Sequence, residues 1–324
     1  MQHIFIVNNV AGGGRKTVEL IPRIDSYFNN AGGSYEIVTT KCKGDATEIA
    51  RRYAQTGEHI RLYSCGGDGT LHEVINGVVG YKNVEVGAFP CGTGNDYVST
   101  YGKAEDFLDV KAQVEGSAVD VDLILADGVY SINQCSIGFD AAVANNVSRF
   151  KQKPLITNSG AYILSVMYTL AGKLGNRLRI YVDDNPPVEG SYLFAVAAKG
   201  QYQGGGMMNA PLARPTSRTL SCMFVRTVSR VKFLSLFPKY MKGQHLAAAD
   251  VVTSCTAKKM RVISDKPVPV ALDGEIIISS DITAEVVPKA LNFVVPSTVS
   301  VKCDEKDDKV VIKSRPKATA DKTE

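Results

Sequence analysis

Two carboxylates stand close together near the end of the chain, in the segment Leu272-Asp273-Gly274-Glu275 at the lip of a strand-like run. Transfer of a phosphoryl group to an alcohol needs a carboxylate that accepts the hydroxyl proton, while Mg²⁺ and backbone amides neutralise the phosphates. Asp273 is well suited to that role, and Glu275 is the second candidate. The alternative is a simple hairpin turn, because Asp-Gly pairs are typical of such turns.

A glycine-rich segment, Gly66-Gly67-Asp68-Gly69-Thr70, follows a buried strand and opens a helix. Unpaired backbone N–H groups and the helix dipole attract phosphate at such a place, and glycines let the backbone approach a ligand closely. Asp68 would repel a phosphate directly, so in a nucleotide site it either orients the loop or holds Mg²⁺, directly or through water. The alternative is a glycine-rich turn in which Asp68 caps the helix.

Other polar and glycine-containing segments also follow predicted strands, namely Asn8 to Gly14, Thr40, and Pro90 to Asp96. In a parallel sheet these strand ends share one edge, which is where ligands bind in open α/β sheets. The side chains that could line a nucleotide cleft there are Asn8, Thr40, Thr70, Thr93 and Asn95. Neither established nucleotide fingerprint fits, because Gly12 to Thr17 is too short for GxxxxGK[ST] and Gly92-Thr93-Gly94 lacks the third glycine of GxGxxG.

A further glycine-rich segment, Gln201 to Met207, lies in the second half of the chain. It contains three consecutive glycines, which leave the backbone open on both sides. The spacing is compatible with a flexible loop and with a place where a substrate approaches the backbone.

The first third of the chain alternates short apolar runs with helical periodicity, which predicts a parallel sheet covered by helices. The expected strands are 3–8, 35–40, 60–65 and 84–89. Asp45 and Glu48 have the spacing of a capping box for a helix over 45–54. The apolar stripes of the other two helices run from Leu20 to Phe28 and from Leu71 to Val79.

Beyond about residue 122 strand-like runs dominate and predict a β-rich, sandwich-like second domain. Helical spacing appears only near 161–174 and 233–241. We therefore expect an α/β nucleotide-binding domain at 1–122 and a β-rich substrate domain at 123–298, with 299–312 returning to the first domain and 313–324 forming a mobile tail. The expected strands of the second half are 128–136, 177–182, 192–198, 220–227, 259–264 and 275–287.

Composition excludes several classes of protein. The chain has 324 residues, of which 44% are hydrophobic and 22% charged, so it is neither disordered nor fibrous. A formal net charge of +4 is too small to indicate a nucleic-acid binder. The sequence shows no signal peptide, no membrane-spanning run, no CxxC pair and no HExxH pattern, which favours a cytoplasmic protein without disulfides or zinc.

The motifs occur in an order that resembles the lipid kinases with a diacylglycerol kinase catalytic domain, particularly the soluble bacterial members. Sphingosine and ceramide kinases are eukaryotic relatives of that family, and NAD kinases are more distant ones. The similarity covers almost the whole chain. Its motifs are Gly66 to Gly77, Pro90 to Asp96, Ser136 to Ala141, Tyr202, Gly204 to Gly206, Ala210-Pro211, Gly243 with His245, and Asp273 to Glu275.

The resemblance implies transfer of phosphate from ATP, with Mg²⁺, to a lipid hydroxyl, with the nucleotide lying between the two domains. It implies Asp273 or Glu275 as the proton acceptor, Asp273 being the better placed, and Asp68 as the residue that meets the magnesium of Mg-ATP. The implied nucleotide-binding residues are Asn8, Gly12, Gly14, Thr40, Gly66, Gly67, Asp68, Gly69, Thr70, Glu73, Thr93 and Asn95. Those implied at the substrate or behind it are Asp96, Asn76, Tyr202, Gly204 and Gly205.

The chain departs from the family pattern at two places. Asn8-Asn9 stands where the family usually has Asn-Pro, which removes a rigidifying proline but keeps the glycines. After Ala210-Pro211 many bacterial members carry an aspartate that holds a structural Mg²⁺, whereas 214–220 contains no carboxylate here. We therefore expect this accessory metal site to be absent or weak, with Arg214 and Arg218 either replacing its charge, meeting anionic headgroups or facing solvent.

Three functions remain open on the sequence. The leading hypothesis is a lipid kinase that contacts the membrane surface transiently, phosphorylates diacylglycerol or a similar lipid, and binds no nucleic acid. The others are a soluble NAD or small-molecule kinase and a noncatalytic nucleotide-binding protein. The presence of Asp68, Asp273 and Glu275 argues against the last one. The sequence does not decide between a monomer and a homodimer.

Overall fold

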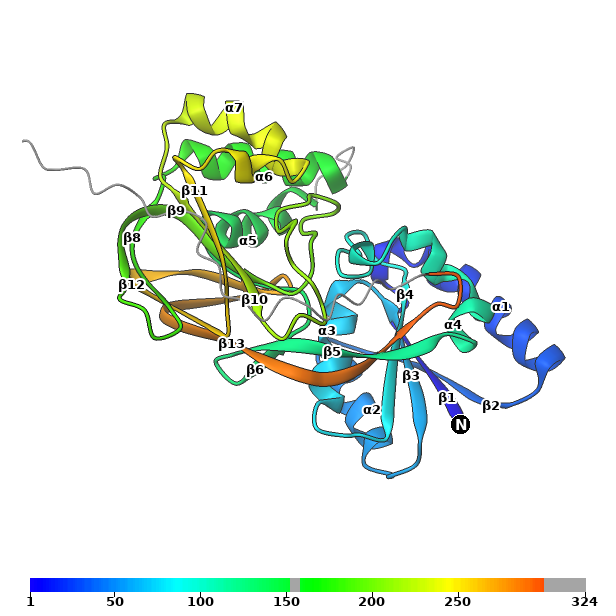
Figure 1. The fold of residues 1–324 in the computed structure, drawn as a ribbon. Coiled ribbons are helices and arrows are strands. Elements are labelled where there is room, and N and C mark those ends of the chain that lie inside the picture. Colours follow the sequence, from blue (N-terminus) through cyan, green and yellow to red (C-terminus); the bar gives the residue numbers. More distant parts are fainter. Residues whose placement is uncertain (152–157, 300–324) are drawn as a thin grey trace, which may run out of the picture.

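The N-terminal region is a parallel sheet covered by helices, as its alternating pattern predicts (Figure 1). The computed structural model describes residues 1–151 and 158–299. The sheet order is β2-β1-β3-β4, formed by β1 (Gln2–Val7), β2 (Ser34–Thr39), β3 (Ile60–Gly66) and β4 (Val84–Pro90). The helices are α1 (Arg15–Ala31), α2 (Asp45–Ala54), α3 (Asp68–Val78) and α4 (Val110–Val114), with 3-10 turns at Ala11–Gly13, Val98–Thr100 and Ala104–Leu108.

The strand register brings four loops to one edge of this sheet. Val7 pairs with both Thr39 and Cys65, and Gly66 pairs with Pro90. Because the strands are parallel and end level with one another, the loops that follow them leave side by side. The predicted convergence of the polar and glycine-rich segments at one edge is therefore confirmed.

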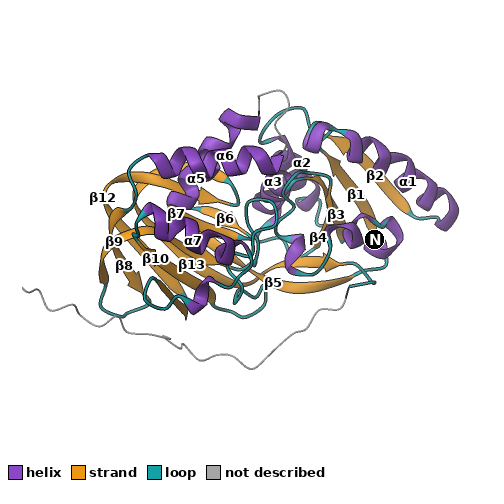
Figure 2. Cartoon of the chain, turned by 90° about the horizontal axis from the view of Figure 1, so that it is seen from above, coloured by secondary structure: helices purple, strands orange, loops and turns teal. Residues whose placement is uncertain are grey.

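The C-terminal region is rich in antiparallel strands and is covered on one side by helices (Figure 2). Phe139, Val166 and Phe233, one from each of three helices, pack with side chains of β9 and β10 in one hydrophobic cluster. The helices are α5 (Phe139–Lys151), α6 (Asn158–Ala171) and α7 (Arg230–Met241), with a 3-10 turn at His245–Ala247. The strands are β5 (Ser117–Ala126), β6 (Val129–Ser131), β7 (Gln134–Gly138), β8 (Asn176–Val182), β9 (Val188–Ala198), β10 (Leu220–Arg226), β11 (Val252–Ala257), β12 (Lys259–Leu272) and β13 (Glu275–Val295).

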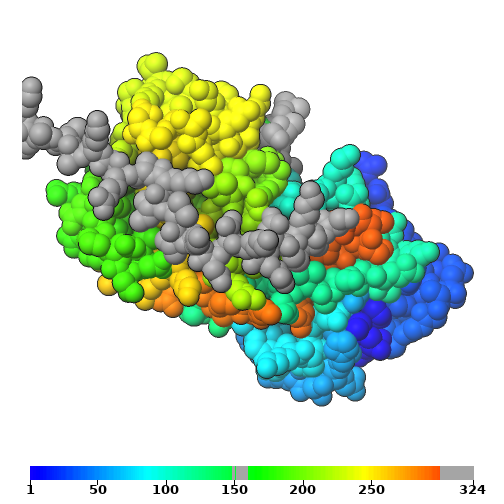
Figure 3. Space-filling model, in the orientation of Figure 1, coloured from blue at the N-terminus to red at the C-terminus, as the bar shows by residue number. Residues whose placement is uncertain are grey.

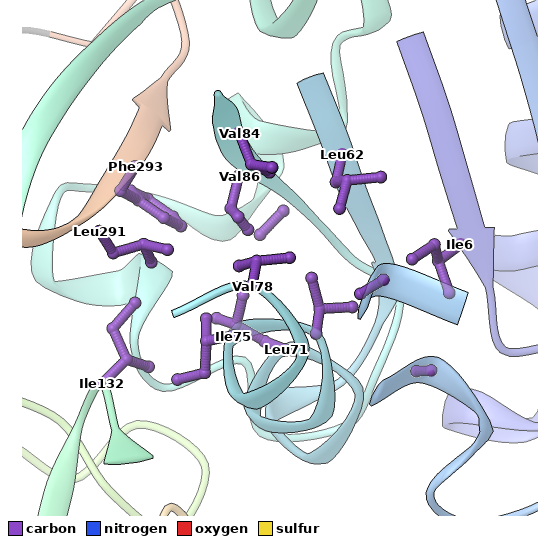
Figure 4. Close-up of a cluster of buried hydrophobic side chains, with 14 of the residues drawn as sticks. Ile6, Leu62, Leu71, Ile75, Val78, Val84, Val86, Ile132, Leu291 and Phe293 are labelled. Carbon is purple, nitrogen blue, oxygen red and sulfur yellow. The ribbon is translucent and has the colours of Figure 1, made fainter. Parts of the chain in front are cut away.

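Strand β13 joins the two regions into one continuous sheet. Its first part pairs with β12, and its last part pairs in parallel with β4 through Asn292 and Phe293. Leu291 and Phe293 then complete the core that α3 forms against the N-terminal sheet, together with Leu71, Ile75 and Val78 (Figure 4). In the space-filling view the orange end of β13 lies against the teal and blue N-terminal region (Figure 3).

The chain thus returns to the N-terminal region before residue 299. The segment 299–312, where we expected the return, lies outside the described residues except for Val299, and so does the expected tail at 313–324. The expected division at residue 122 falls inside β5, which pairs along its length with β13. The domain limits therefore stay a prediction from the sequence.

Three local expectations differ from the structure. The run 128–136 is not one strand but two, β6 and β7, separated by a turn at Ile132 and Asn133. The capping box of α2 is wrong, because the N-cap is Gly44, Asp45 accepts a hydrogen bond from the Lys41 N–H, and Glu48 pairs with Arg51. Strands β5 and β11 and helix α5 have no counterpart among the elements expected from the sequence.

Candidate active site

Three loops at the edge of the parallel sheet pack backbone against backbone. A Cβ atom on Gly12 would overlap the carbonyl oxygen of Cys91, and a Cβ on Gly92 would overlap the Cα of Gly67. A Cβ on Gly67 would in turn lie 3.1 Å from the Cα of Gly92. Glycine is required at these positions because no side chain fits between the loops.

The N-terminus of α3 faces the space beside these loops. Its N-cap is Gly67, and no side chain caps the first turn. The orphan N–H groups of an uncapped helix and its dipole together favour a bound anion. Asn8 donates to the Thr70 hydroxyl at 3.1 Å, which ties the loop after β1 to this helix.

Asp68 orients a loop rather than capping its own helix. Its carboxylate accepts hydrogen bonds from the backbone N–H groups of Asn95 and Asp96, both at 2.7 Å, and of Tyr97 at 3.4 Å. Burial raises the pKa of Asp68, and these three backbone bonds oppose that rise. The helix-cap alternative for this aspartate is therefore wrong, and its loop-orienting role is observed.

A pocket of about 530 Å³, here called the glycine-loop pocket, opens among these loops. The buried Oδ1 atom of Asn95 has no hydrogen-bond partner among the described residues, and it would lie 3.1 Å from a Cβ on Gly92, a residue of the pocket wall. Gly14, Gly66 and Asn95 are the predicted nucleotide residues that do not line the pocket. Those that do are Asn8, Gly12, Thr40, Gly67, Asp68, Gly69, Thr70, Glu73 and Thr93.

Glu73 holds one wall of the glycine-loop pocket in place. Its two carboxylate oxygens accept hydrogen bonds from the N–H groups of Gly44 at 2.9 Å and Ala46 at 3.2 Å. Glu73 of α3 thus accepts hydrogen bonds from N–H groups at the start of α2, which neither Asp45 nor Glu48 caps. It fixes the segment 40–46, which carries Lys43.

A second pocket of about 550 Å³, here called the carboxylate pocket, adjoins the first. Asp68, Thr93 and Gly94 line both pockets. The carboxylate pocket is otherwise lined by residues of the C-terminal region, among them Asp140, Gln203, Gly204, Gly205 and Asp273, together with Asp96. Two pockets with a shared wall thus lie where the sequence predicts a site between the two regions, and the identity of their ligands stays a prediction.

Asp273 is buried and surrounded by hydrogen-bond donors. Its Oδ1 accepts from the Ser131 hydroxyl and from the N–H groups of Asn133 at 2.9 Å and Gln134 at 3.0 Å. Its Oδ2 accepts from the Ile132 N–H at 2.9 Å and lies 3.1 Å from the His72 Nδ1. A carboxylate has roughly four lone-pair positions, so these five donors leave none of them free.

The charges of Asp273 and His72 support each other. Burial alone would raise the pKa of Asp273, but the hydrogen bond and charge of His72 and the Ser131 and backbone donors lower it. Burial would lower the pKa of His72, yet the hydrogen bond and charge of Asp273 raise it. Asp273 is therefore an ionised, weakly basic carboxylate at neutral pH.

Glu275 lies next to residues of both pockets, since Gly274 lines the carboxylate pocket and Lys43 lines the glycine-loop pocket. Its carboxylate pairs with the Lys43 ammonium, and its side chain is 38% exposed. A Cβ on Gly69 would lie 3.9 Å from its Oε1, which places this oxygen near the start of α3. Unlike Asp273, Glu275 has one side-chain partner among the described residues, the exposed Lys43, and can release it to meet another group.

Asp96 is tied to the triple glycine. Its carboxylate accepts from the N–H groups of Gly205 at 2.9 Å and Gly206 at 3.0 Å. Gly204, Gly205 and Gly206 all have positive φ angles, the conformation that glycine adopts most readily. Burial and then the nearby charge of Asp68 raise the pKa of Asp96 to about 7.

Two predicted substrate residues form hydrogen bonds with the segment 130–134, whose turn donates to Asp273. The Asn76 side chain exchanges hydrogen bonds with the backbone of Tyr130 in both directions, at 2.8 and 3.0 Å. The Tyr202 carbonyl accepts from the side chains of Asn133 at 2.9 Å and Gln134 at 3.3 Å. Neither Asn76 nor Tyr202 lines a pocket wall described above.

Sequence reasoning missed several residues of this site. His72 carries no sequence signal of its own except that it follows the glycine turn by two residues. Ser131 to Gln134 read as part of a strand, so the turn that presents their N–H groups was not expected. Asp140 belongs to a motif that was noted, Ser136 to Ala141, but it was assigned no role.

The described residues show no preformed metal centre, because none of their His, Cys, Asp and Glu side chains gather in threes. In the segment 214–220, the side chain of Arg214 reaches the carbonyls of Pro211 and Ala213. Lys199, which lies outside this segment, contacts it through a buried ammonium that donates to the Thr219 carbonyl at 2.9 Å and the Ser217 hydroxyl at 3.1 Å, and also to Asp122 at 2.7 Å. The weakness of the accessory metal site stays a prediction.

Family models match both regions of the chain and identify it as a kinase. Residues 2–126 match the diacylglycerol kinase catalytic domain. Residues 133–295, half of the chain, match the YegS C-terminal NAD kinase beta sandwich-like domain. The chain therefore belongs to the lipid kinase family that combines these two domains.

Individual proteins agree with this assignment. "Putative lipid kinase YtlR" of Bacillus subtilis is 26% identical over 291 residues, which cover 85% of this chain and 94% of that protein. "Putative lipid kinase SH2167" of Staphylococcus haemolyticus is 27% identical over 234 residues, covering 72% and 75%. The crystal structure of a putative diacylglycerol kinase from Bacillus anthracis shares the fold, with a TM-score of 0.74 at 22% identity over 92% of this chain and 98% of that chain.

The close packing of the glycine loops yields a prediction. Replacing Gly92 by alanine should lower the free energy of unfolding by about 1–3 kcal/mol, because the new Cβ overlaps the Gly67 backbone and overpacking costs about that much. Denaturant unfolding measures the effect. Gly190→Ala in β9 is the control, since its Cβ would meet Tyr192 at an ordinary 3.5 Å. Equal stability of both variants would show that the loops can move apart without cost.

Proposed function

We propose that this protein is an ATP-dependent lipid kinase that transfers the γ-phosphate to a hydroxyl of diacylglycerol or a similar lipid. The junction of the two pockets at Asp68, Thr93 and Gly94 carries the proposal. ATP in the glycine-loop pocket would present its terminal phosphate to a hydroxyl in the carboxylate pocket. Membership of the lipid kinase family supports the same reaction.

The residues of the glycine-loop pocket suit a nucleotide. The uncapped start of α3 offers N–H groups to phosphate oxygens, and the glycines leave the backbone accessible. Lys41 and Lys43 line the same pocket and add positive charge.

Asp68 is the residue of this chain that fits magnesium. It lines both pockets, and its Oδ2 accepts only the hydrogen bond of the Asn95 N–H, so one lone pair remains. Mg²⁺ bound with ATP would neutralise phosphate charge during transfer. Asp68 would then combine two tasks, because its other oxygen holds the loop 95–97.

The two candidate proton acceptors take different roles in this proposal. Glu275 accepts the hydroxyl proton, because its neighbour Gly274 lines the carboxylate pocket and its partner Lys43 lines the glycine-loop pocket and is exposed. Asp273 has no free lone pair for a substrate proton and organises the turn 131–134. This reverses the expectation that Asp273 is the better placed of the two carboxylates.

Apolar surfaces next to the carboxylate pocket favour a lipid acceptor. A small apolar pocket of about 50 Å³ lies beneath α6 and α7 and shares Asp140 and Tyr162 with the carboxylate pocket. Large apolar side chains are also exposed on these two helices, as expected of a face that contacts a membrane surface. They are Ile163, Leu164, Met167 and Tyr168 of α6 and Val231, Leu234 and Met241 of α7.

Phosphate transfer tests the proposal directly. The full chain is incubated with radiolabelled ATP, Mg²⁺ and lipids in mixed micelles, with NAD and water-soluble alcohols as parallel acceptors. We expect label in chloroform-extractable product. Label only in aqueous acceptors would establish a soluble kinase instead, and ATP binding without transfer to any acceptor would favour a noncatalytic protein.

Substitution separates the roles of the two carboxylates. Glu275→Gln should lower kcat by about 10² to 10⁴ with unchanged ATP affinity and unfolding temperature, because proton acceptance contributes about that factor. Asp273→Asn should lower both turnover and the unfolding temperature, since an amide NH₂ would face buried donors. Glu285→Gln, exposed on the same strand and paired with Lys259, is the matched control.

The opposite pattern would contradict this assignment. If Glu275→Gln kept near-normal turnover while Asp273→Asn lost it at unchanged stability, Asp273 would be the proton acceptor. Steady-state kinetics and thermal unfolding on the same preparations distinguish the two cases.

A further inference from the structure

Asp140 occupies the place where the carboxylate pocket meets the apolar pocket. Together with Tyr162 it lines both, and it stands in the first turn of α5. No role assigned above involves Asp140. It is not the proposed proton acceptor, not a predicted nucleotide-binding residue and not a partner of Asp273. A lipid that entered the apolar pocket with its chain would pass this carboxylate with its polar part.

The Asp140 carboxylate is buried with few partners. It is 4% exposed, and among the described residues its one side-chain hydrogen bond comes from the Tyr240 hydroxyl at 3.3 Å to Oδ2. Within 1–151 and 158–299, as far as side chains are described, no cationic group lies within ion-pair distance of it. Asp273 by comparison has five donors, so Asp140 keeps most of its capacity to accept hydrogen bonds.

The charge state of Asp140 favours acceptance over donation. Burial raises its pKa to about 6, and the Tyr240 hydroxyl opposes that rise. The group is therefore mainly ionised above pH 7, and its position at a helix N-terminus also favours the negative charge. An ionised carboxylate can only accept hydrogen bonds.

The chemistry of a bound ligand decides whether it stabilises or destabilises the buried Asp140 carboxylate. A buried carboxylate without donors is costly, so an O–H or N–H group brought by the ligand is stabilising there. Ester carbonyls are acceptors and would face the Asp140 oxygens with like partial charge. A diacylglycerol has one hydroxyl, which phosphoryl transfer occupies, and otherwise two esters.

We propose that Asp140 selects acceptor lipids with a second hydrogen-bond donor next to the hydroxyl that is phosphorylated, while the start of the acyl chain enters the apolar pocket. Resting on the function proposed above, this narrows the substrate class. A monoacylglycerol, with adjacent hydroxyls, or an N-acyl amino alcohol lipid, with an amide N–H, fits better than a diacylglycerol. Asp140 is then a specificity residue.

The first part of the test, the transfer arm, measures phosphate transfer by the same enzyme to different lipids. Wild type should use 1-mono-oleoylglycerol and ceramide with kcat/KM at least about tenfold above that for dioleoylglycerol, at pH 8 in identical mixed micelles. Asp140→Asn should bring the ratio to within about threefold, partly by improving dioleoylglycerol, because an amide NH₂ can donate to an ester. ATP KM should not change. Asp250→Asn, exposed on the surface, is the matched control.

The second part of the test, the binding arm, measures lipid binding and does not depend on phosphate transfer. Fluorescence anisotropy without ATP measures the affinity of the full chain for fluorescent monoacylglycerol and diacylglycerol probes, and wild type but not Asp140→Asn should prefer the first. Equal affinity for both probes in wild type, or a preference that Asp140→Asn leaves intact, overturns the inference. If wild type phosphorylates no lipid, the proposed kinase function fails, and the binding arm alone decides the role of Asp140.

Discussion

A single buried carboxylate, that of Asp273, sets the arrangement of the whole site. A charge without solvent must be matched by donors, and here the donors come from α3 through His72 and from the turn between β6 and β7. The turn that follows β12 carries Asp273 itself. Helix α3 of the N-terminal region and two turns of the C-terminal region therefore meet at Asp273. Displacing any one of them would leave a buried charge or a buried N–H unpaired.

This constraint explains why two pockets can share a wall. Helix α3 starts at the glycine-loop pocket with Asp68 and reaches Asp273 through His72, one turn later. Strand β13 starts beside Asp273 at the carboxylate pocket and ends in the N-terminal core with Phe293. Each region thus sends one element into the other, so the spacing between the two pockets is fixed by the same contacts that stabilise the fold.

The sequence predicts this site unevenly, for physical reasons. Parallel strands place their ends at one edge, so alternation alone located Asn8, Thr40, Gly67 and Thr93 together. The role of Asp273 could not be read in the same way, because its donors are backbone N–H groups, which every residue possesses, in a run that looks like one strand. Likewise, Glu73 caps a neighbouring helix rather than its own, and only tertiary packing brings the two together. The return of the chain through β13 was missed because a strand of 21 residues that changes partners has no local signature.

The ionisation of the Asp273 and His72 pair is the most direct test of this account, and NMR of the His72 ring measures it. The signal is assigned with His72→Gln and followed across pH in wild type and in Asp273→Asn. We predict that the ring of wild type titrates above its ordinary pKa of 6.5, and that burial brings the pKa below that value once the carboxylate charge is removed. A wild-type pKa at or below 6.5, unchanged in Asp273→Asn, would contradict an ionised Asp273 as the organising group of the site.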